Sequence, residues 1–251
     1  MLGIPLAITS YAEVADWIEA MLASGSRGSV SAAAVHLVMR AQESAEVMAA
    51  VLAATLVVPD GQPLVWALHA LGHRAATRVY GPDLMALCCQ RAAAAGTPMY
   101  LYGGRDEAAL DALRAALVER HPGIAIAGGF SPPHRELTAQ EEDAVVARIE
   151  DSGAQIVWVG IGQPRQEQWM ARMRGRLSAP MLAAVGAAFD FHAGLVPQAP
   201  AWMGRRGLEW SYRLAREPRR LWRRYARYNP RFVAAFARQY AAARRRGGAR
   251  E

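Results

Sequence analysis

Lysine is absent from this sequence of 251 residues, so all 29 basic side chains are arginine. Long apolar runs are absent as well, and no stretch reaches the ~18 uninterrupted apolar residues of a membrane-spanning helix. The first residues lack the basic and apolar regions of a signal peptide, so we expect neither a spanning helix nor a secretory leader.

Cysteine is scarce. The adjacent Cys88 and Cys89 are expected to be buried as small apolar side chains in a reducing cytoplasm.

Acidic residues are scarce in one part of the chain, from Arg205 to Glu251. This segment contains 15 arginines and three glutamates, a net +12 against +7 for the whole chain, which leaves −5 on the rest. Such a basic segment suits an anionic partner, either phospholipid, polyphosphate or nucleic acid. No nucleic-acid-binding motif occurs, so nucleic acid is not expected as a partner. A basic protein that docks nucleic acid through this segment stays an alternative.

Short apolar runs alternate with helical patterns as far as about residue 190. Runs of four to six apolar residues between helices are typical of strands in a parallel sheet. We therefore predict an α/β fold, Rossmann-like, with a mostly parallel sheet and helices on both faces. The predicted strands are Ser29–Ala34, Thr55–Pro59, Pro98–Tyr102, Ile124–Ala127, Gln155–Val159 and Met181–Val185. The predicted helices are Glu13–Ala23, Val38–Ala53, Leu64–Leu71, Pro82–Ala95, Glu107–Arg120, Thr138–Asp151 and Gln166–Leu177.

The pattern changes near residue 195, which predicts a body over residues 1–195 and a helical appendage over residues 196–251. Tryptophan, tyrosine and arginine recur in the appendage at three- and four-residue spacing. Arginine beside Trp and Tyr is typical of helices that lie at a membrane surface, so we expect the appendage to bind one. The alternative is a helix pair that packs on the body and exposes its arginines.

The helical pattern of the appendage extends from Trp202 to Phe236 and contains two prolines. Because proline lacks an N–H and disturbs a helix interior, we expect interruptions at Pro218 and Pro230. Residues 241–251, rich in arginine, are expected to fray.

Glycine follows most of the predicted strands, at the edge of the sheet where open α/β folds bind ligands. Glycine lets the backbone approach a phosphate closely and present its N–H groups, so we predict a nucleotide site at this edge. The alternative is that strand-to-helix turns favour glycine in any case. The residues concerned are Gly61, Gly103, Gly104, Gly128, Gly129, Gly160, Gly162 and Gly186.

Asp60 lies between an apolar strand and Gly61, at the same edge. A carboxylate in this place can accept a proton from an attacking hydroxyl group. An aspartate before glycine also commonly caps a helix or forms an Asx-turn, and position alone does not separate the two roles.

A second candidate is the segment from Gly160 to Glu167, where a strand ends and a helix begins near Pro164. The helix N-terminus would present its N–H groups to a phosphate, and Arg165, Gln166 and Glu167 in its first turn would point into the same crevice. An ordinary strand-to-helix turn is the alternative.

Asp190 and His192 form a third candidate, on a segment expected to be extended. Two ligands are too few for a metal ion, so nucleotide binding or structural hydrogen bonding is favoured. The chain also contains no Asp-x-Asp, the pair with which many nucleotide-sugar enzymes hold a divalent ion. Arginines would then have to bind a leaving diphosphate. Those available are Arg78, Arg213, Arg216, Arg219, Arg220, Arg223 and Arg224.

Seven blocks in order along the chain together resemble one family, the WecG/TagA/CpsF glycosyltransferases, over about residues 28–228. Each block alone is weak, but the ordered set is specific. The blocks are Pro59-Asp-Gly61, Arg78-Val-Tyr-Gly-Pro-Asp83, Leu101-Tyr-Gly-Gly104, Val159-Gly-Ile-Gly-Gln-Pro-Arg-Gln-Glu167, Gly186-Ala-Ala-Phe-Asp190, Ala199-Pro-Ala-Trp202 and Gly207-Leu-Glu-Trp-Ser-Tyr-Arg-Leu-Ala-Arg-Glu-Pro-Arg219.

The resemblance implies an inverting, metal-independent hexosyltransferase that uses a UDP-sugar donor, a polyprenyl-diphosphate-linked acceptor and no cofactor. It implies that Asp60 is the catalytic base, that Gln166 lies near the sugar or diphosphate, and that Asp190 lies near the nucleotide. It also implies that appendage arginines complete the site at the cytoplasmic face of the inner membrane; we assign Arg213, Arg216 and Arg219 to the catalytic site. The expected binding residues are His36, Gly61, Arg78, Gly103, Gly104, Gly160, Gly162, Gln163, Glu167 and Asp190.

Two departures from the family pattern indicate a branch. Family members that act on lipid-linked GlcNAc show Thr-x-Asn near the first strand, where this chain has residues 31–33, Ser-Ala-Ala. Their Arg-Ala-Pro is here Gln198-Ala-Pro200. The stretches around His36 and Trp66 resemble the exopolysaccharide branch, which acts on longer lipid-linked oligosaccharides. An N-acetylmannosamine transferase to lipid-linked GlcNAc and a non-catalytic UDP-sugar-binding module stay alternatives, and a homo-oligomer stays open.

Overall fold

The computed structural model describes residues 1–247 of the chain and is built on a six-stranded sheet in which every neighbouring pair of strands is parallel. The strand order is β2-β1-β6-β5-β3-β4. This confirms the predicted Rossmann-like α/β class. The strands are β1 (Gly28–Ala33), β2 (Leu56–Pro59), β3 (Met99–Gly103), β4 (Ile126–Phe130), β5 (Ile156–Gly160) and β6 (Met181–Ala184).

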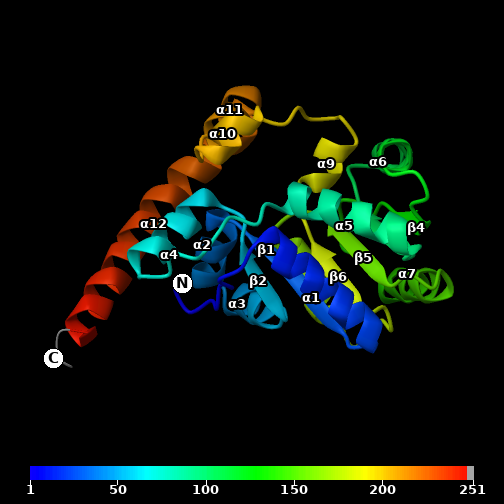
Figure 1. Ribbon diagram of the computed structural model, residues 1–251, viewed down its shortest axis with the longest axis horizontal. Helices are drawn as coiled ribbons and strands as arrows, with labels where there is room; N and C mark the ends of the chain where they lie inside the picture. Colours follow the sequence, from blue (N-terminus) through cyan, green and yellow to red (C-terminus); the bar gives the residue numbers. More distant parts are fainter. Residues whose placement is uncertain (248–251) are drawn as a thin grey trace.

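Helices cover both faces of the sheet (Figure 1). One face carries α1 (Tyr11–Ser24), α5 (Gly81–Ala95), α6 (Glu107–Arg120) and the short α9 (Ala188–His192). The other carries α7 (Ala139–Asp151) and α8 (Arg165–Met173), and beside them α2 (Val35–Glu43), α3 (Ala45–Leu52) and α4 (Gln62–Ala70).

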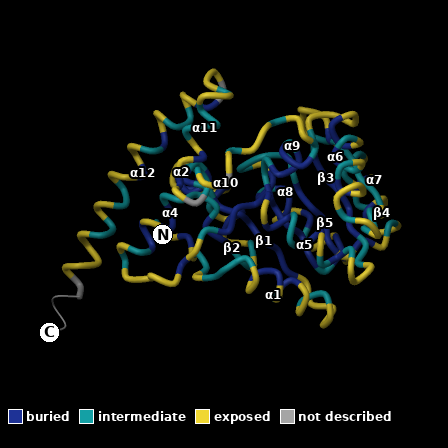
Figure 2. The backbone as a smooth tube through the Cα atoms, turned by 45° about the horizontal axis from the view of Figure 1, so that its top comes forward, coloured by how far each residue is buried: buried dark blue, intermediate teal, exposed yellow. Residues whose placement is uncertain are grey.

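The two-sided burial follows from the alternation of side chains along each strand. In β5, Trp158 packs with α5 and α6, whereas Val157 and Val159 pack with α7 and α8. The strands β6, β5 and β3 therefore contain only apolar, aromatic and glycine residues, as strands covered on both faces do, and the sheet forms the buried centre of the molecule in Figure 2. Cys88 and Cys89 are buried on α5 with free thiols, as predicted.

The C-terminal part consists of α10 (Ala201–Arg205), α11 (Glu209–Arg216) and the long α12 (Pro218–Gly247). Helix α12 begins at Pro218 but passes through Pro230, so the predicted interruption there is wrong. Tyr228 and Phe232, on either side of Pro230, are buried against α2 and α4, and this packing offsets the hydrogen bond that proline cannot make.

An acidic residue of the body also holds α12. Glu43, at the end of α2, accepts hydrogen bonds from Arg227 at 3.0 Å and from Arg231 at 2.7 Å. The expected fraying from residue 241 is wrong as far as Gly247, where α12 ends, and residues 248–251 lie outside the described part.

Two further boundaries differ from the predictions. The single helix expected from Val38 to Ala53 is divided at Ser44, whose hydroxyl accepts the N–H of Val47 and begins α3. Gly128 and Gly129 lie inside β4 rather than after it, because the register of β3 and β4 shifts beside Met99.

Gly103→Ala should lower the free energy of unfolding by about 2–3 kcal/mol. Gly103 has a φ of 142°, and an added Cβ would lie 2.6 Å from the backbone of Gly160. Chemical denaturation measures the change. Gly175→Ala is the control, because an added Cβ there would meet nothing within 4 Å. Equal losses of unfolding free energy in Gly103→Ala and Gly175→Ala would show that the close approach of Gly103 to Gly160 has no effect on stability.

Candidate active site

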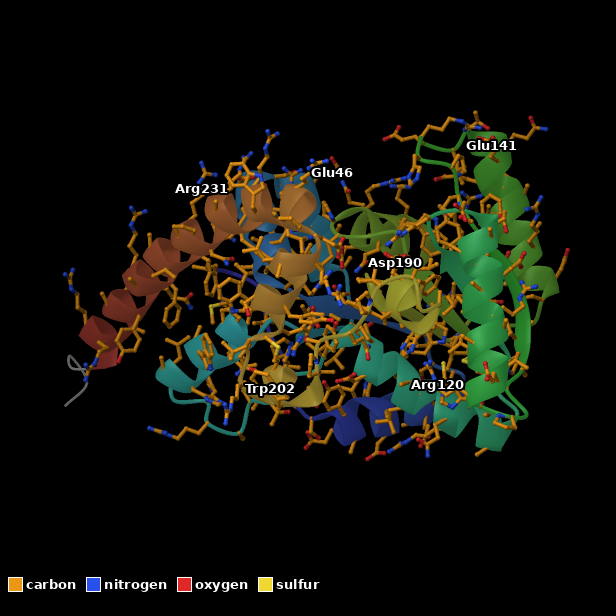
Figure 3. All side chains as sticks on the ribbon, turned by 90° about the horizontal axis from the view of Figure 1, so that it is seen from above. Glu46, Arg120, Glu141, Asp190, Trp202 and Arg231 are labelled. Atoms are coloured by element: carbon orange, nitrogen blue, oxygen red, sulfur yellow. The ribbon has the colours of Figure 1, made fainter. Side chains whose placement is uncertain are left out.

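A cavity of about 740 Å³ opens at the carboxyl edge of the sheet, and residues that follow all six strands line it, together with α4, α11 and α12. In Figure 3 Asp190 lies near the centre of the view, whereas Arg231 lies to one side, on α12. Ten of the predicted site residues line the cavity: His36, Asp60, Gly61, Arg78, Gly104, Gly160, Gly162, Gln163, Asp190 and Arg213.

Five predicted site residues do not line the cavity. Gly103 is buried in β3, and Gln166 and Glu167 are buried beneath the floor. Arg216 and Arg219 lie exposed on the outer surface of α11 and α12.

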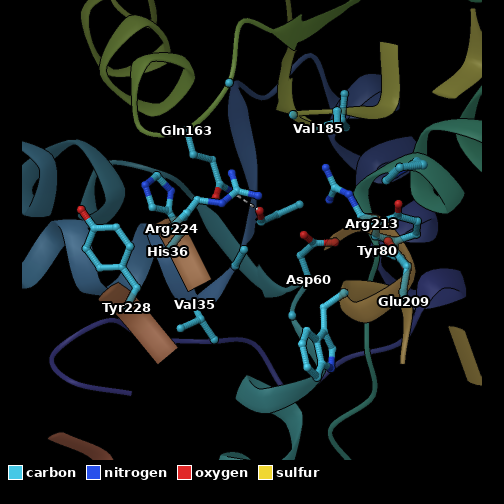
Figure 4. A pocket seen from close by; sticks show the side chains of 18 of the residues that line it. Val35, His36, Asp60, Tyr80, Gln163, Val185, Glu209, Arg213, Arg224 and Tyr228 are labelled. Carbon is cyan, nitrogen blue, oxygen red and sulfur yellow. Dashed lines mark hydrogen bonds between the residues drawn. The ribbon is translucent and has the colours of Figure 1, made fainter. Parts of the chain in front are cut away.

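Asp60 lies near the middle of the cavity, between groups from the body and the appendage (Figure 4). Its Oδ1 accepts the N–H of Gly81 at 3.1 Å. Burial raises the pKa of Asp60 to about 6, and the Glu209 carboxylate adds to this rise, whereas Arg78, the Gly81 N–H and Arg213 oppose it. The carboxylate is thus a stronger base than an exposed aspartate and stays ionised at neutral pH.

Arg78 links Asp60 to the appendage. Its Nε donates to the backbone carbonyl of Asp60 at 2.6 Å, and its Nη2 donates to Oε2 of Glu209 on α11 at 2.8 Å. The guanidinium also lies over the ring of Tyr80, 4.2 Å from its centroid. Arg78 therefore holds the loop after β2 and the start of α11 together.

Asp190 faces the cavity from α9, so the extended conformation predicted for residues 190–192 is wrong. Its two oxygens accept both arms of the Arg105 guanidinium, at 2.9 and 3.1 Å. His192 points into the core instead. Its Nε2 lies 2.9 Å from the carbonyl of Pro82 and its Nδ1 2.8 Å from Arg120, which gives it a structural role.

Gln166 and Glu167 form a buried polar cluster with Ser31 of β1, where the sequence predicted side chains in the crevice. Oε1 of Glu167 accepts the Ser31 hydroxyl at 2.9 Å and the Gln166 amide at 3.0 Å. Burial raises the pKa of Glu167 to about 7, and these two hydrogen bonds oppose the rise. Gln166 lies below Gly186. A Cβ added to Gly186 would be 3.9 Å from the side-chain Oε1 of Gln166. The cluster therefore supports the floor.

Besides Arg78, four arginines line the cavity: Arg105, Arg165, Arg213 and Arg224. Arg213 lies over the ring of Phe191, and its Nε has no hydrogen-bond partner within residues 1–247. Beside Arg224 lies His36, whose pKa burial lowers to about 4, with Arg224 and Arg40 adding to the effect, so the imidazole is neutral. The cavity therefore has cationic groups on both sides of Asp60.

Sequence patterns alone did not identify Arg105, Tyr80 and Glu209 as site residues. Arg105 directly follows Gly103 and Gly104 at the end of β3, a position that could have pointed to it. Tyr80 and Glu209 belonged to recognised blocks, but only the fold brings them to Asp60.

Neither a metal-binding cluster nor a spanning helix occurs in the described part of the chain. Within residues 1–247, no three His, Cys, Asp or Glu side chains gather in a way that could hold a metal ion. No helix in the same residues has both the length and the apolar character to cross a bilayer.

Glu167→Gln should remove a pH-dependent contribution to stability. The unfolded chain releases this proton near pH 4.5 and the folded chain near pH 7, so the free energy of unfolding should fall over this window in the wild type. The expected fall is on the order of 3 kcal/mol, and denaturation at several pH values measures it. Glu46→Gln, at an exposed carboxylate, should keep the wild-type slope. A wild-type slope in Glu167→Gln would show that folding does not raise the pKa of Glu167.

The sequence matches the family model described as "Glycosyl transferase WecG/TagA/CpsF family" over residues 1–246, nearly the whole chain. The chain therefore belongs to this glycosyltransferase family.

Proposed function

We propose, from the premise that the chain is a glycosyltransferase of this family, that it moves a sugar from a UDP-sugar to a polyprenyl-diphosphate-linked saccharide with inversion. The observation that carries the proposal is the position of Asp60, a carboxylate of raised pKa in a cavity with arginines on both sides. The product would be a lipid-linked precursor of bacterial exopolysaccharide or a related surface glycan.

In the proposed reaction, Asp60 accepts the proton of an acceptor hydroxyl group. The hydroxyl oxygen forms a bond to the anomeric carbon of the donor sugar while the bond from this carbon to the UDP oxygen breaks. The configuration at the carbon inverts, UDP leaves with the bonding electrons, and the proton stays on Asp60. A base whose pKa is close to the working pH suits this transfer.

The leaving diphosphate needs positive charge, and the arginines of the cavity can supply it without a metal ion or cofactor. Arg213 comes from α11 of the appendage, Arg105 comes from the loop after β3, and Arg165 is the first residue of α8. Preorganised charge of this kind usually lowers the activation barrier more than any other catalytic effect. We give Arg78 a different role, because its N–H groups already donate to Glu209 and to the Asp60 carbonyl. Arg78 positions the base instead of binding the diphosphate.

We assign the nucleotide to the side of the cavity formed by β3 and β5. Gly104 and Gly160 allow close approach of phosphate to the backbone, and Asp190 lies beside them with Arg105. The acceptor then approaches from β1, β2 and α4. Ala32 and Ala34 line that side and offer no polar side chain to a sugar. Their presence favours the exopolysaccharide branch over an enzyme that binds a single GlcNAc through hydrogen bonds.

We propose further that the protein works as a peripheral protein on the cytoplasmic face of the membrane. Three tryptophans of the appendage, Trp202, Trp210 and Trp222, are 49%, 43% and 53% exposed. Trp222 carries the guanidinium of Arg223 over its ring at 5.8 Å. Exposed indole beside arginine is typical of helices at an anionic bilayer surface.

Asp60→Asn should lower turnover by about 10²–10⁴-fold, because the amide cannot accept the acceptor's proton. Binding of UDP should change little, since Asp60 is assigned to the acceptor. Transfer from labelled UDP-sugars to bacterial lipid extracts measures turnover, and calorimetry measures UDP binding. In the wild type, kcat/KM should fall about tenfold per unit below pH 6. Unchanged turnover in Asp60→Asn would refute the assignment of the base.

Trp222→Ala should weaken binding to vesicles that contain anionic lipid several-fold, because the indole would lose its place at the bilayer interface. Co-sedimentation with vesicles measures this. Val118→Ala removes a comparably exposed apolar side chain from α6, on the body, and should leave binding unchanged. Equal binding by both variants would contradict membrane docking through Trp222.

A further inference from the structure

The part of the cavity between α4 and α12 is largely apolar, unlike the part around Asp60. Side chains from the start of α2, from α4 and from four turns of α12 form its walls. They include Pro63, Trp66, Tyr225, Tyr228, Phe232, Val233 and Phe236. We name this part the α4–α12 groove.

The walls of the groove contain large apolar side chains that the protein itself does not cover. Trp66 is 52% exposed and Val233 is 64% exposed, although the same two helices bury Leu64 and Phe232 in the core. Scattered exposed apolar residues are ordinary, but exposed ones that line one cavity indicate a ligand.

The groove is held open by rigid contacts. Gly207, in the turn before α11, packs on α4 so closely that an added Cβ would lie 3.1 Å from the Trp66 ring. Trp210 of α11 meets Tyr225 of α12 edge to face, with their ring centroids 6.1 Å apart. The walls are therefore set by packing and do not depend on an occupant.

The chemistry changes in order along the cavity. In Figure 4, Tyr228 lies at one end, then His36 with Arg224, then Asp60, and then Arg213. An apolar end, a cation and a catalytic carboxylate follow one another. A lipid-linked sugar has the matching sequence of a hydrocarbon chain, a diphosphate and a sugar hydroxyl.

We infer that the α4–α12 groove binds the first isoprene units of the acceptor's polyprenyl chain, with Arg224 beside the diphosphate. The inference rests on the proposed function, because that function supplies a polyprenyl acceptor. A second copy of the chain or an apolar peptide could also cover Trp66 and Val233, but neither brings an anion to the cationic groups next to Asp60. The groove would thus select acceptors by their hydrocarbon part as well as by their sugar.

Binding of prenyl diphosphates tests this without catalysis. Calorimetry on the full-length chain should give farnesyl diphosphate at least tenfold higher affinity than inorganic diphosphate. The double variant Trp66→Gln with Val233→Gln should reduce the affinity for farnesyl diphosphate at least tenfold and leave that for inorganic diphosphate within twofold. The control, Leu52→Gln with Val118→Gln, changes two side chains that are 48% and 51% exposed outside the cavity and should keep both affinities.

Equal affinities for the two diphosphates in the wild type would overturn the inference, and so would equal losses in the two double variants. A wild type that sediments as a dimer beside a monomeric groove variant would assign the groove to a second copy instead. Circular dichroism confirms that each variant folds.

Sugar transfer then separates the groove from the proposed function. Acceptors with three isoprene units should have at least tenfold higher kcat/KM than acceptors with one, and the groove variant should lose this preference while it retains transfer to the short acceptor. Chain-length-dependent binding with no transfer of any sugar would overturn the proposed function and support the groove. Transfer without a chain-length preference would support the proposed function and overturn the assignment of the groove.

Discussion

The arrangement of the active-site edge depends on the largely buried guanidinium of Arg78. Residues that are 131 positions apart meet there, because Arg78 pairs with Glu209 while it donates to the carbonyl of Asp60. A guanidinium in this place needs an anion, since an unpaired buried charge is strongly destabilising. The ion pair therefore couples the docking of the appendage to the position of the base.

Helix α12 belongs to both the core and the site. Tyr228 and Phe232 complete the apolar cluster with α2 and α4, and Glu43 pairs with arginines on the same helix. One side of the arginine-rich segment packs on the body, as the alternative interpretation of a packed helix predicted, while Trp222 on the same segment stays exposed.

The sheet could be predicted from the sequence because each strand is a short apolar run and each run is followed by a turn. Asp60 could be placed at the ligand edge for the same reason. The burial of Gln166 and Glu167 beneath the cavity could not be predicted, because it depends on the hydrogen bond between Glu167 and Ser31, which lies far away in the sequence. Pro230 misled because local propensity omits the packing of Tyr228 and Phe232. The partners Arg105–Asp190 and Arg78–Glu209 are tertiary pairs that no local spacing encodes.

The place of α12 also has a consequence for how the protein is made. A ribosome synthesises all six strands before it reaches residue 218, and domains generally fold as units during synthesis. The cavity would still lack one wall at that stage, because Arg224, Tyr225 and Tyr228 belong to α12, which emerges after the whole sheet. The nascent chain would thus have a sheet that is able to fold before the site is complete, and the docking of α12 would then add the missing wall of the cavity.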